Sequence, residues 1–561
     1  MHVFVQIIVL WIGIIFAFPT SSNTNVFLDA TISTNTIQRF QENSENREND
    51  ERRLLKKVFL SNRSITCNDG SQAGFYLRKS HISKTWIIFL EGGWYCYDSH
   101  SCKNRWLRQR HFMTSSHWPD TRNEGGILSP NEEENPYWWN ANHVFVPYCT
   151  SDSWSGTRRS RDELFNFMGA LVVQQVVKDL VPLGLENSTN LLLAGSSAGG
   201  TGVMVNLDPT RELLHDFLNL KHISVRGVTD SGWFLDRTPY TQTGRPAVDN
   251  IRKGMQLWHG KVPKRCRKLY ENEPWRCYFG YRLYPALKTP LFIFQWLFDE
   301  AQMNADNVGA PVTKQQWDYI HKMGDALRQS FENVTAVFAP SCISHSVLTK
   351  KDWLNVKIDD VSVAQALYCW ERQPIKKHKK KRKITSMFAD EPTLVSKQIN
   401  RTLKNYDIND KASVASVEDL NRRRKRRKRR RKERGKGKTQ KKKGCKLRNE
   451  NELCRNKTRH NASSSLKPTQ HPRLQRSVLK AQKNSQDCPH RRLERCTWPQ
   501  CNHSCPRLHN PFTGEEMDFI ELLKSFGLDM ESVADALGID MTTLNNMDHS
   551  ELLNLLTQQT S

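Results

Sequence analysis

The chain has 561 residues, with 84 Lys and Arg against 58 Asp and Glu, which gives a net charge of +26 at pH 7. This length suits one large α/β domain with appendages, or two to four average domains. Residues 376–383 carry +7 and residues 422–443 carry +16, together +23 of the +26. The rest of the chain is therefore nearly neutral, and the basic composition does not indicate a nucleic-acid-binding fold.

The N-terminus begins with an uncharged apolar run at 3–18, followed by small polar residues. This run is short for a membrane span, so it predicts a secretory signal peptide over 1–22, with a retained anchor as the alternative. No later run is long and apolar enough to cross a bilayer, and we expect no transmembrane segment. Residues 23–57 are polar and are expected to be disordered.

From residue 58 to residue 375 the chain alternates short apolar runs with helix-like patterns. A helical pattern of three- and four-residue apolar spacing covers 162–180. The apolar runs, each bounded by turn signals, are 86–90, 143–148, 190–195, 223–230 and 291–299. This alternation predicts an α/β catalytic domain with a mostly parallel sheet and helices on both faces.

Residues 376–487 break this pattern, because they are dominated by Lys, Arg, Asn, Ser and Gln and show no sustained apolar period. We predict a disordered polybasic insert there. Residues 488–561 are Cys-rich and then helical, with amphipathic patterns at 517–526 and 550–556. This C-terminal part is expected to complete the catalytic domain.

The fourteen cysteines, an even number, suit the oxidising compartment that a signal peptide implies. A zinc site is the rival interpretation, but the C-terminal cysteines lack a C-x-x-C spacing, and we expect no metal. Seven N-x-S/T sequons also agree with secretion. The cysteines close enough for local pairing are Cys96 with Cys102, Cys266 with Cys277, the group Cys496, Cys501 and Cys505, and, inside the insert, Cys445 with Cys454.

The stretch LLLAGSSAGG at 191–200 ends an apolar run in a tight turn. Gly195, Ser197 and Gly199 fit G-x-S-x-G, in which a strained strand-to-helix turn presents a serine nucleophile. The frame selects Ser197 and leaves Ser196 in an unspecified position. Alone this motif is a weak signal, because Ser/Gly-rich turns are common.

A serine nucleophile also needs amide donors for the oxyanion, a base and an acid. The amide of Ala198, which follows the serine, is one expected donor. The run WIIFLEGGW at 86–94 offers others, since paired glycines after a strand allow close approach of a ligand to the backbone. Its alternative interpretation is a simple turn.

Two aspartates that end apolar runs are candidates for the acid. Asp299 is favoured over Asp230 because it ends a later run, where the acid usually lies. Among the histidines after the serine, His345 is favoured because it lies in a loop of small residues, whereas His321 lies in a helical pattern. The other histidines between the serine and the insert are His215, His222 and His259.

Seven motifs together resemble the pectinacetylesterase family, and within it the secreted carboxylesterases that inactivate Wnt proteins. They are LEGGWYC (90–96), EENPYWWNANHVFVPYC (133–149), LLLAGSSAGGTGV (191–203), DSGWFLD (230–236), QWLFDEAQ (295–302), CISH (342–345) and WPQCNHSCP (498–506). The resemblance covers roughly 60–374 and 488–561. The polybasic insert departs from it, since it resembles nothing in the shorter vertebrate forms.

The resemblance implies an α/β-hydrolase fold and removal of a palmitoleoyl ester from a Wnt serine, without cofactor or metal. It implies Ser197, Asp299 and His345 as the triad, and so decides against Asp230. A glycosylated sequon is implied at Asn62. The implied oxyanion donors are Gly93, Trp94 and Ala198, and the implied acyl-pocket aromatics are Trp94, Tyr95, Phe234 and Phe279.

Three other functions remain open from the sequence. A polysaccharide acetylesterase or a phospholipase acting on lipid anchors would share the same triad. A non-catalytic secreted protein could instead bind heparan sulfate through the insert. Nucleic acid is not an expected partner of a secreted chain, so the polyanion expected for the insert is heparan sulfate, for example on glypicans. We therefore expect an extracellular protein held at cell-surface proteoglycans. Two alternatives for the insert stay open from the sequence: it is only a solvated charged segment, or its many dibasic pairs are cleaved by secretory proteases.

Overall fold

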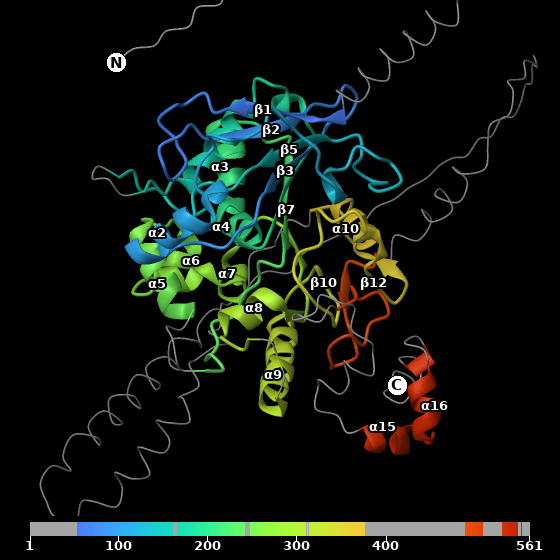
Figure 1. Ribbon diagram of the computed structural model, residues 1–561. Helices are drawn as coiled ribbons and strands as arrows, with labels where there is room; N and C mark the ends of the chain where they lie inside the picture. Colours follow the sequence, from blue (N-terminus) through green and yellow to red (C-terminus); the bar gives the residue numbers. More distant parts are fainter. Residues whose placement is uncertain are drawn as a thin grey trace, which may run out of the picture. The chain divides into compact units, whose positions relative to one another are not determined.

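The structure is a computed structural model that describes residues 53–160, 165–241, 247–309, 311, 313–375, 488–508, 530–547 and 551–552 (Figure 1). The described residues on both sides of the insert belong to one compact unit. The predicted signal peptide, most of the segment 23–57, the insert with Cys445 and Cys454, and the pattern at 517–526 lie outside the described residues.

The centre of this unit is a ten-stranded sheet in the order β14-β10-β8-β7-β6-β3-β5-β2-β1-β4. The pairs from β14 to β5 are parallel, whereas β5–β2, β2–β1 and β1–β4 are antiparallel. The strands are β1 Leu55–Phe59, β2 Gly74–Arg78, β3 Thr85–Leu90, β4 Thr121–Arg122, β5 Asn142–Val146, β6 Asn190–Ser196, β7 Ser224–Asp230, β8 Leu291–Phe294, β10 Val337–Ala339 and β14 Arg491–Leu493.

Two short strand pairs lie outside this sheet, namely β9 Phe298–Asp299 with β11 Ile343–Ser344, and β12 Lys357–Ile358 with β13 Val361–Ser362. The α-helices are α2 Ser99–Arg108, α3 Gly169–Leu180, α4 Ala198–Glu212, α5 Ala247–Leu257, α6 Lys264–Leu269, α7 Gly280–Leu283, α8 Glu300–Ala305, α9 Lys314–Ser330, α10 Val363–Glu371, α15 Met530–Leu537 and α16 Met541–Asn546.

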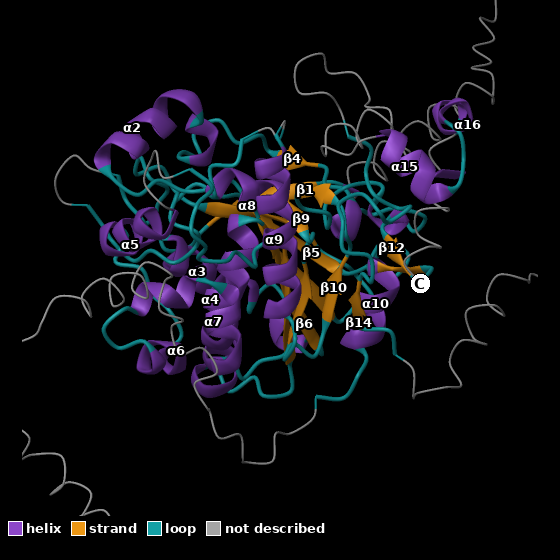
Figure 2. Ribbon diagram, turned by 90° about the horizontal axis from the view of Figure 1, so that it is seen from below, coloured by secondary structure: helices purple, strands orange, loops and turns teal. Residues whose placement is uncertain are grey.

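Successive side chains of a strand point to opposite faces of the sheet, and here the side chains on both faces are buried. In β6, Leu191 and Leu193 enter the core that includes α3, α4 and α9, whereas Leu192 and Ala194 enter the core that includes α10. Figure 2 shows the sheet, in orange, between helices. The predicted mostly parallel sheet with helices on both faces is therefore confirmed.

The apolar runs at 86–90, 143–148, 190–195 and 223–230 correspond to β3, β5, β6 and β7. The run at 291–299 is not one strand. Its ladder with β7 stops at the pair Asp230–Phe294, because β7 ends there, and the chain forms a second strand only at Phe298–Asp299.

The helical pattern at 162–180 is wrong for residues 165–168, because α3 begins at Gly169, and residues 162–164 lie outside the described residues. Before it, Phe167 exchanges two main-chain hydrogen bonds with Arg158, at 2.8 and 2.9 Å. The amide of Gly169 then donates to the buried carboxylate of Asp152 at 2.8 Å. These contacts with Arg158 and Asp152 hold residues 165–168 in a non-helical conformation.

The described residues differ from the expected boundaries at one point, and they also show how the chain returns to the sheet after the insert. Strand β1 begins at Leu55, inside the segment expected to be disordered, because Leu55 is buried and β1 pairs with both β2 and β4. After the insert, β14 adds a parallel strand to β10.

Six disulfides join the described cysteines. Cys96–Cys102 and Cys266–Cys277 form as predicted. In the C-terminal group Cys496 pairs with Cys501, but Cys505 pairs with Cys342, 163 residues away, because these two cysteines are brought together by the fold. The remaining bonds are Cys67–Cys149 and Cys369–Cys488.

Among the residues that the structure describes, no helix has the length and apolar character needed to cross a bilayer.

Candidate active site

Ser197 stands between β6 and α4, at the turn that the sequence motif predicts. Its φ of 57° and ψ of −123° are strained for a non-glycine residue. Its amide donates to the main-chain oxygen of Asp230 at 2.8 Å. Its hydroxyl makes no capping bond to the first turn of α4, so the helix N-terminus behind it, starting at Ala198, keeps its partial positive charge.

The glycines of the motif are required by close backbone approach. A Cβ on Gly199 would lie 2.0 Å from the main-chain oxygen of Leu90. A Cβ on Gly195 would lie 2.6 Å from the main-chain oxygen of Gly199. Side chains at these positions would force the end of β3 away from the turn. Residues other than glycine are therefore sterically excluded at positions 195 and 199.

The loop after β3 lies directly against this turn. A Cβ on Gly92 would lie 2.9 Å from Cβ of Ser197. Gly93 and Trp94 follow with positive φ values of 132° and 60°. The main-chain oxygen of Gly93 accepts a hydrogen bond from Arg105, which holds the loop against α2. The loop predicted to carry oxyanion donors thus lies beside the predicted nucleophile.

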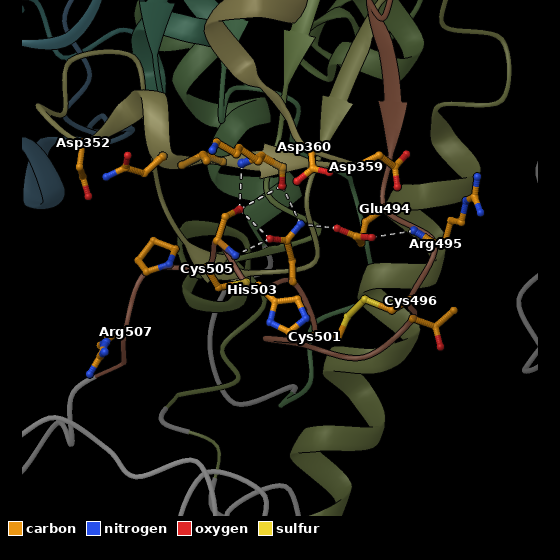
Figure 3. Close-up of a pocket in the computed structure, with 17 residues that line it drawn as sticks. Asp352, Asp359, Asp360, Glu494, Arg495, Cys496, Cys501, His503, Cys505 and Arg507 are labelled. Atoms are coloured by element: carbon orange, nitrogen blue, oxygen red, sulfur yellow. Dashed lines mark hydrogen bonds between the residues drawn. A yellow bond between two sulfur atoms is a disulfide. The ribbon is translucent and has the colours of Figure 1, made fainter. Parts of the chain in front are cut away.

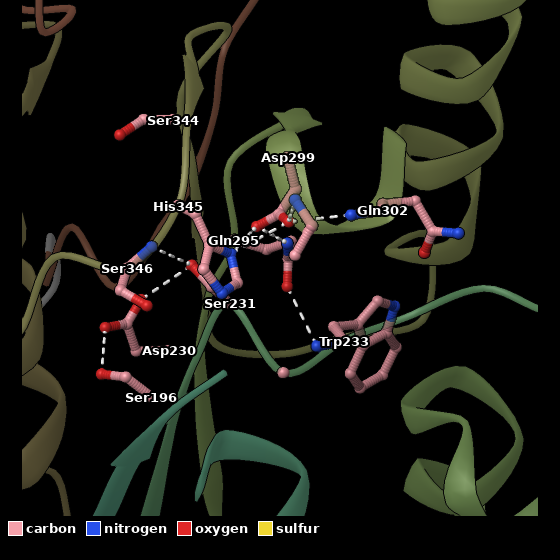
Figure 4. A network of polar contacts seen from close by, with 12 residues as sticks. Ser196, Asp230, Ser231, Trp233, Gln295, Asp299, Gln302, Ser344, His345 and Ser346 are labelled. Atoms are coloured by element: carbon pink, nitrogen blue, oxygen red, sulfur yellow. Dashed lines mark hydrogen bonds and ion pairs between the residues drawn. The ribbon is translucent and has the colours of Figure 1, made fainter. Parts of the chain in front are cut away.

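His345 and Asp299 form a hydrogen-bonded pair, drawn in Figure 4. His345 Nδ1 lies 3.0 Å from Asp299 Oδ1 and 2.9 Å from Asp299 Oδ2. Asp299 is fully buried, and Oδ1 also accepts the amides of Ala301 and Gln302 at 2.9 and 3.2 Å, at the start of α8. Gln295 donates to Oδ2 at 3.0 Å. The carboxylate is therefore fixed on several sides.

The charges around His345 favour its protonated form. Burial alone would lower the pKa of His345, but the charge and hydrogen bond of Asp299, and the charges of Asp230 and Glu300, raise this pKa above its ordinary value of 6.5. An imidazole of this kind can take a proton from a nucleophile and hold it as an ion pair with the carboxylate.

A cavity of about 470 Å³ is lined by both Ser197 and His345. Gly92, Gly93 and Trp94 also line it, so the predicted nucleophile, base and oxyanion loop meet at one space. Further aromatic residues, which the sequence reasoning did not select, complete the apolar lining: Phe89, Phe112 and Phe145.

The four predicted acyl-pocket aromatics belong to one cluster, which adjoins the cavity. Trp94 stacks on Tyr95 at 5.0 Å between ring centroids and meets the edge of Phe234 at 6.3 Å. Tyr95, Phe234 and Phe279 are buried in this cluster. Of the four, only Trp94 is among the described residues that line the cavity.

Asp230, the other acid candidate, does not hydrogen-bond to the imidazole in the described contacts. Its carboxylate accepts instead from Ser196, Ser231 and the main chain after His345. Ser196, which occupies the unspecified position of the motif, thus donates its hydroxyl to Asp230 at 2.5 Å. Histidines His215 and His222 bond main-chain oxygens elsewhere, and His321 lies in α9 as predicted.

A larger cavity, of about 1140 Å³, lies at the Cys-rich segment (Figure 3). Its polar groups bond to one another: Asn502 and Ser504 both donate to the main-chain oxygen of Lys357, at 2.8 and 3.0 Å. The sulfurs of Cys496, Cys501 and Cys505 are in disulfides, which excludes the zinc interpretation. In the described part of the chain, no group of His, Cys, Asp or Glu side chains could hold a metal ion.

Comparisons with known proteins agree with this geometry. The pectinacetylesterase family model matches residues 48–395. The palmitoleoyl-protein carboxylesterase NOTUM of Drosophila melanogaster is 48% identical, over 91% of this chain and 88% of its own length. The human NOTUM carboxylesterase is 38% identical, over 88% and 81%.

The chain belongs to the Notum group of the pectinacetylesterase family. A solved structure, the Wnt deacylase Notum from Drosophila, is 62% identical, with a TM-score of 0.56 over 57% of this chain and 93% of that chain. Membership of this family confirms the predicted α/β-hydrolase-like fold and the resemblance seen in the seven motifs.

Some residues that shape the site carry weak signals in the sequence. Gln295 lies inside an apolar run, and although it opens the motif at 295–302, nothing in the sequence assigned it a role. Arg105, which holds the loop of Gly93, lies on a helix that offers no motif. Asp230 had a clear signal at a strand end, but spacing alone could not distinguish an acid from a structural anchor.

Proposed function

We propose that this protein is a secreted serine carboxylesterase that hydrolyses the O-palmitoleoyl ester on a serine of Wnt proteins. The family to which the chain belongs supports this reaction. The observation that carries the proposal is the hydrogen bond between Asp299 Oδ2 and His345 Nδ1, at 2.9 Å. His345 lines the same cavity as Ser197, which lies on a strained turn.

The proposed reaction has two steps. Ser197 Oγ attacks the ester carbonyl while His345 takes its proton, and His345 then protonates the departing Wnt serine oxygen, which leaves a palmitoleoyl group on Ser197. Water, deprotonated by His345, then attacks this ester. The bond between the acyl carbon and Ser197 Oγ breaks, His345 returns the proton to Ser197, and palmitoleate is released. Asp299 orients the imidazole and stabilises its protonated form.

The negative oxygen of each tetrahedral intermediate needs donors that are in place before the reaction. We assign this role to the amides of Gly93, Trp94 and Ala198. The glycine-rich loop lies against Ser197, and Ala198 begins α4, whose N-terminus favours negative charge. No cofactor or metal takes part in this mechanism.

The acyl chain is assigned to the aromatic cluster of Trp94, Tyr95, Phe234 and Phe279. Burial of a CH₂ group stabilises a complex by about 0.8 kcal/mol, so a sixteen-carbon chain supplies up to ~10 kcal/mol before the costs of binding. Such binding is sufficient to draw a lipid from its carrier protein. Opening of the cluster beside Trp94 would be required, because the other three rings are buried.

The test is deacylation of a palmitoleoylated serine peptide, followed by mass spectrometry, together with p-nitrophenyl esters of increasing chain length. We expect release of palmitoleate, faster turnover of octanoyl than of acetyl esters, and loss of both activities in Ser197→Ala with an unchanged melting temperature. Activity on acetyl esters alone would indicate a polysaccharide acetylesterase, and cleavage of lipid anchors but not of the peptide would indicate a phospholipase.

We also propose that the polybasic insert binds heparan sulfate and holds the enzyme at cell-surface proteoglycans such as glypicans. The supporting observation is the charge of +23 in two runs of Lys and Arg, which suits sulfate groups. A tether of this kind would raise the local concentration of enzyme near membrane-bound Wnt. Release of counterions would make the binding strongly salt-dependent, as for other polyanions.

The test of the tether is elution from a heparin column of the full chain and of a variant that lacks 376–443. The variant should elute at lower salt and keep its esterase turnover. Equal elution would contradict the tether, and loss of turnover would show that the insert supports the catalytic domain. A protein that binds heparin but lacks esterase activity would be the non-catalytic binder.

A further inference from the structure

Asp230 occupies a central position between the two halves of the active site. It is the last residue of β7, is fully buried, and lies in register with Ser196 at the end of β6. Its main-chain oxygen accepts the amide of Ser197 at 2.8 Å. The backbone of Asp230 thus contacts the turn that carries Ser197.

The carboxylate of Asp230 contacts the segment that follows His345. Oδ2 accepts the amides of Val347 and Leu348 at 2.9 and 3.0 Å. Oδ1 accepts the hydroxyl of Ser231 at 2.9 Å, and Ser231 Oγ accepts the amide of Ser346 at 3.0 Å. Three consecutive amides after the histidine are therefore held, two of them directly. The third, that of Ser346, is held through Ser231, as Figure 4 shows.

The segment after His345 requires such support, because its backbone is strained. Within this segment Ser346 has a φ of 63°, in a region that non-glycine residues rarely adopt. Ser231, whose hydroxyl accepts the amide of Ser346, has a φ of 51° in the same region. Strain of this kind persists only where neighbouring contacts determine the conformation. A buried carboxylate that accepts main-chain amides makes charge-assisted bonds, which are stronger than neutral ones.

The hydroxyl of Ser196 completes this arrangement. It donates to Asp230 Oδ2 at 2.5 Å, so this oxygen accepts three hydrogen bonds. Ser196 has no other assigned task, and its side chain points to Asp230 in Figure 4. Both adjacent serines of the motif line the cavity, and what separates them is that the hydroxyl of Ser196 donates to the carboxylate of Asp230.

We propose that Asp230, oriented by Ser196, is a positioning residue that fixes the imidazole of His345 relative to Ser197 through the main chain of residues 346–348. This inference rests on the proposed esterase function. Asp299 acts on the imidazole ring directly, whereas Asp230 acts on the loop that carries it. A displacement of about 1 Å between reacting groups can lower a rate by ~100-fold. Loss of the contacts that Asp230 makes with this loop should therefore lower kcat measurably.

The experiment compares Asp230→Asn and Ser196→Ala with Asp208→Asn as a matched control. Asp208 is also a buried aspartate that accepts main-chain amides, those of Lys288 and Thr289, but it lies outside the site. Turnover, KM and the pH profile are measured with p-nitrophenyl octanoate, and folding is followed by the melting temperature. The main-chain bond to Ser197 persists in every variant, so only the contribution of the side chain is removed.

Asp230→Asn is expected to lower kcat by ~10-fold or more with little change in KM, since the apolar substrate still binds. Ser196→Ala should lower kcat by a few-fold, and Asp208→Asn should leave it unchanged. The charged groups facing His345 are Asp299, Glu300 and Asp230, with Lys350 near Glu300. Removal of the charge of Asp230 should therefore shift the acid limb of kcat/KM to lower pH.

Unchanged kcat in Asp230→Asn would overturn the proposal, and so would an equal loss in Asp208→Asn, which would indicate general destabilisation. If Asp230→Asn does not fold, Ser196→Ala decides: a lower kcat at unchanged melting temperature supports the positioning role, and wild-type kcat overturns it. Full activity in Ser197→Ala would instead refute the esterase mechanism itself, so the two failures are distinguishable.

Discussion

Asp299 and His345 are brought together by a strand pair of only two residues each. Strand β9 pairs with β11 in parallel, with Ser344 opposite Asp299, and His345 follows directly. The backbone register thus places His345 Nδ1 2.9 Å from the carboxylate. This pairing joins segments that are 46 residues apart.

The pH dependence of activity follows from this pair. The base must be neutral in the free enzyme, and the raised pKa of His345 places the acid limb of kcat/KM above pH 6.5. Asp299→Asn should lower turnover by ~1000-fold or more and move this limb to lower pH, because it removes the nearest negative charge. Steady-state rates between pH 5 and pH 9 measure both effects. Near wild-type turnover in Asp299→Asn would show that the acid has been assigned to the wrong residue.

Trp94 is expected to act through both its backbone and its ring. Trp94→Ala keeps the amide but removes the ring that lines the cavity and stacks on Tyr95. We expect kcat/KM to fall by ~10-fold or more for octanoyl esters and much less for acetyl esters. An equal loss for both chain lengths would mean that the ring does not border the acyl pocket.

Glu91 is predicted to make stability depend on pH. Burial raises the pKa of Glu91 to about 7, although the amide of Tyr148 and the charge of Arg122 oppose this. The folded state therefore holds a proton that the unfolded state releases near pH 4.5, and the cost of the buried charge develops between pH 4.5 and 7 and is complete above 7.

Glu91→Gln should remove this cost. The melting temperature of the variant, relative to wild type, is expected to be higher at pH 8.5 than at pH 4.5. The uncharged side chain can still accept from the amide of Tyr148, which the carboxylate now does at 2.7 Å. Thermal denaturation at the two pH values provides the test, and a difference independent of pH would contradict the assigned pKa.

Glycosylation should distinguish two of the sequons. Asn62 is exposed, and its side-chain oxygen accepts the amide of Ser64 at 3.0 Å. Asn502 donates through the nitrogen that would carry a glycan, to Lys357 and Glu494 at 2.8 and 2.5 Å. Glycopeptide mass spectrometry of the secreted protein should find a glycan at Asn62 and none at Asn502. A glycan on Asn502 would mean that this packing forms after modification or not at all.

Much of the fold follows from local patterns in the sequence. Four apolar runs become β3, β5, β6 and β7, because turn residues define their ends and buried parallel strands need continuous apolar character. The pair Cys96–Cys102 also follows from proximity in the chain. Such features depend on neighbouring residues, and so they can be recognised without the tertiary structure.

Other features depend on contacts between distant segments. Cys505 bonds to Cys342 and not to its neighbours, and β14 joins the sheet from beyond the insert. At the site, Gly195, Ser197 and Gly199 were recognisable, because the turn imposes their spacing. The position of Asp299 at the end of a later run already favoured it over Asp230 as the acid. The structural role of Asp230 was not recognisable, because only the hydrogen bonds of its carboxylate reveal it.

In the proposed mechanism Ser197 forms an acyl-enzyme intermediate. The most direct measurement is rapid mixing with p-nitrophenyl octanoate, followed by acid quench and mass spectrometry of the peptide that contains residues 191–200. We expect a burst of nitrophenolate near one equivalent and an octanoyl group on Ser197, both absent in Ser197→Ala. An octanoyl group on Ser196, or full turnover in Ser197→Ala, would show that Ser197 is not the nucleophile.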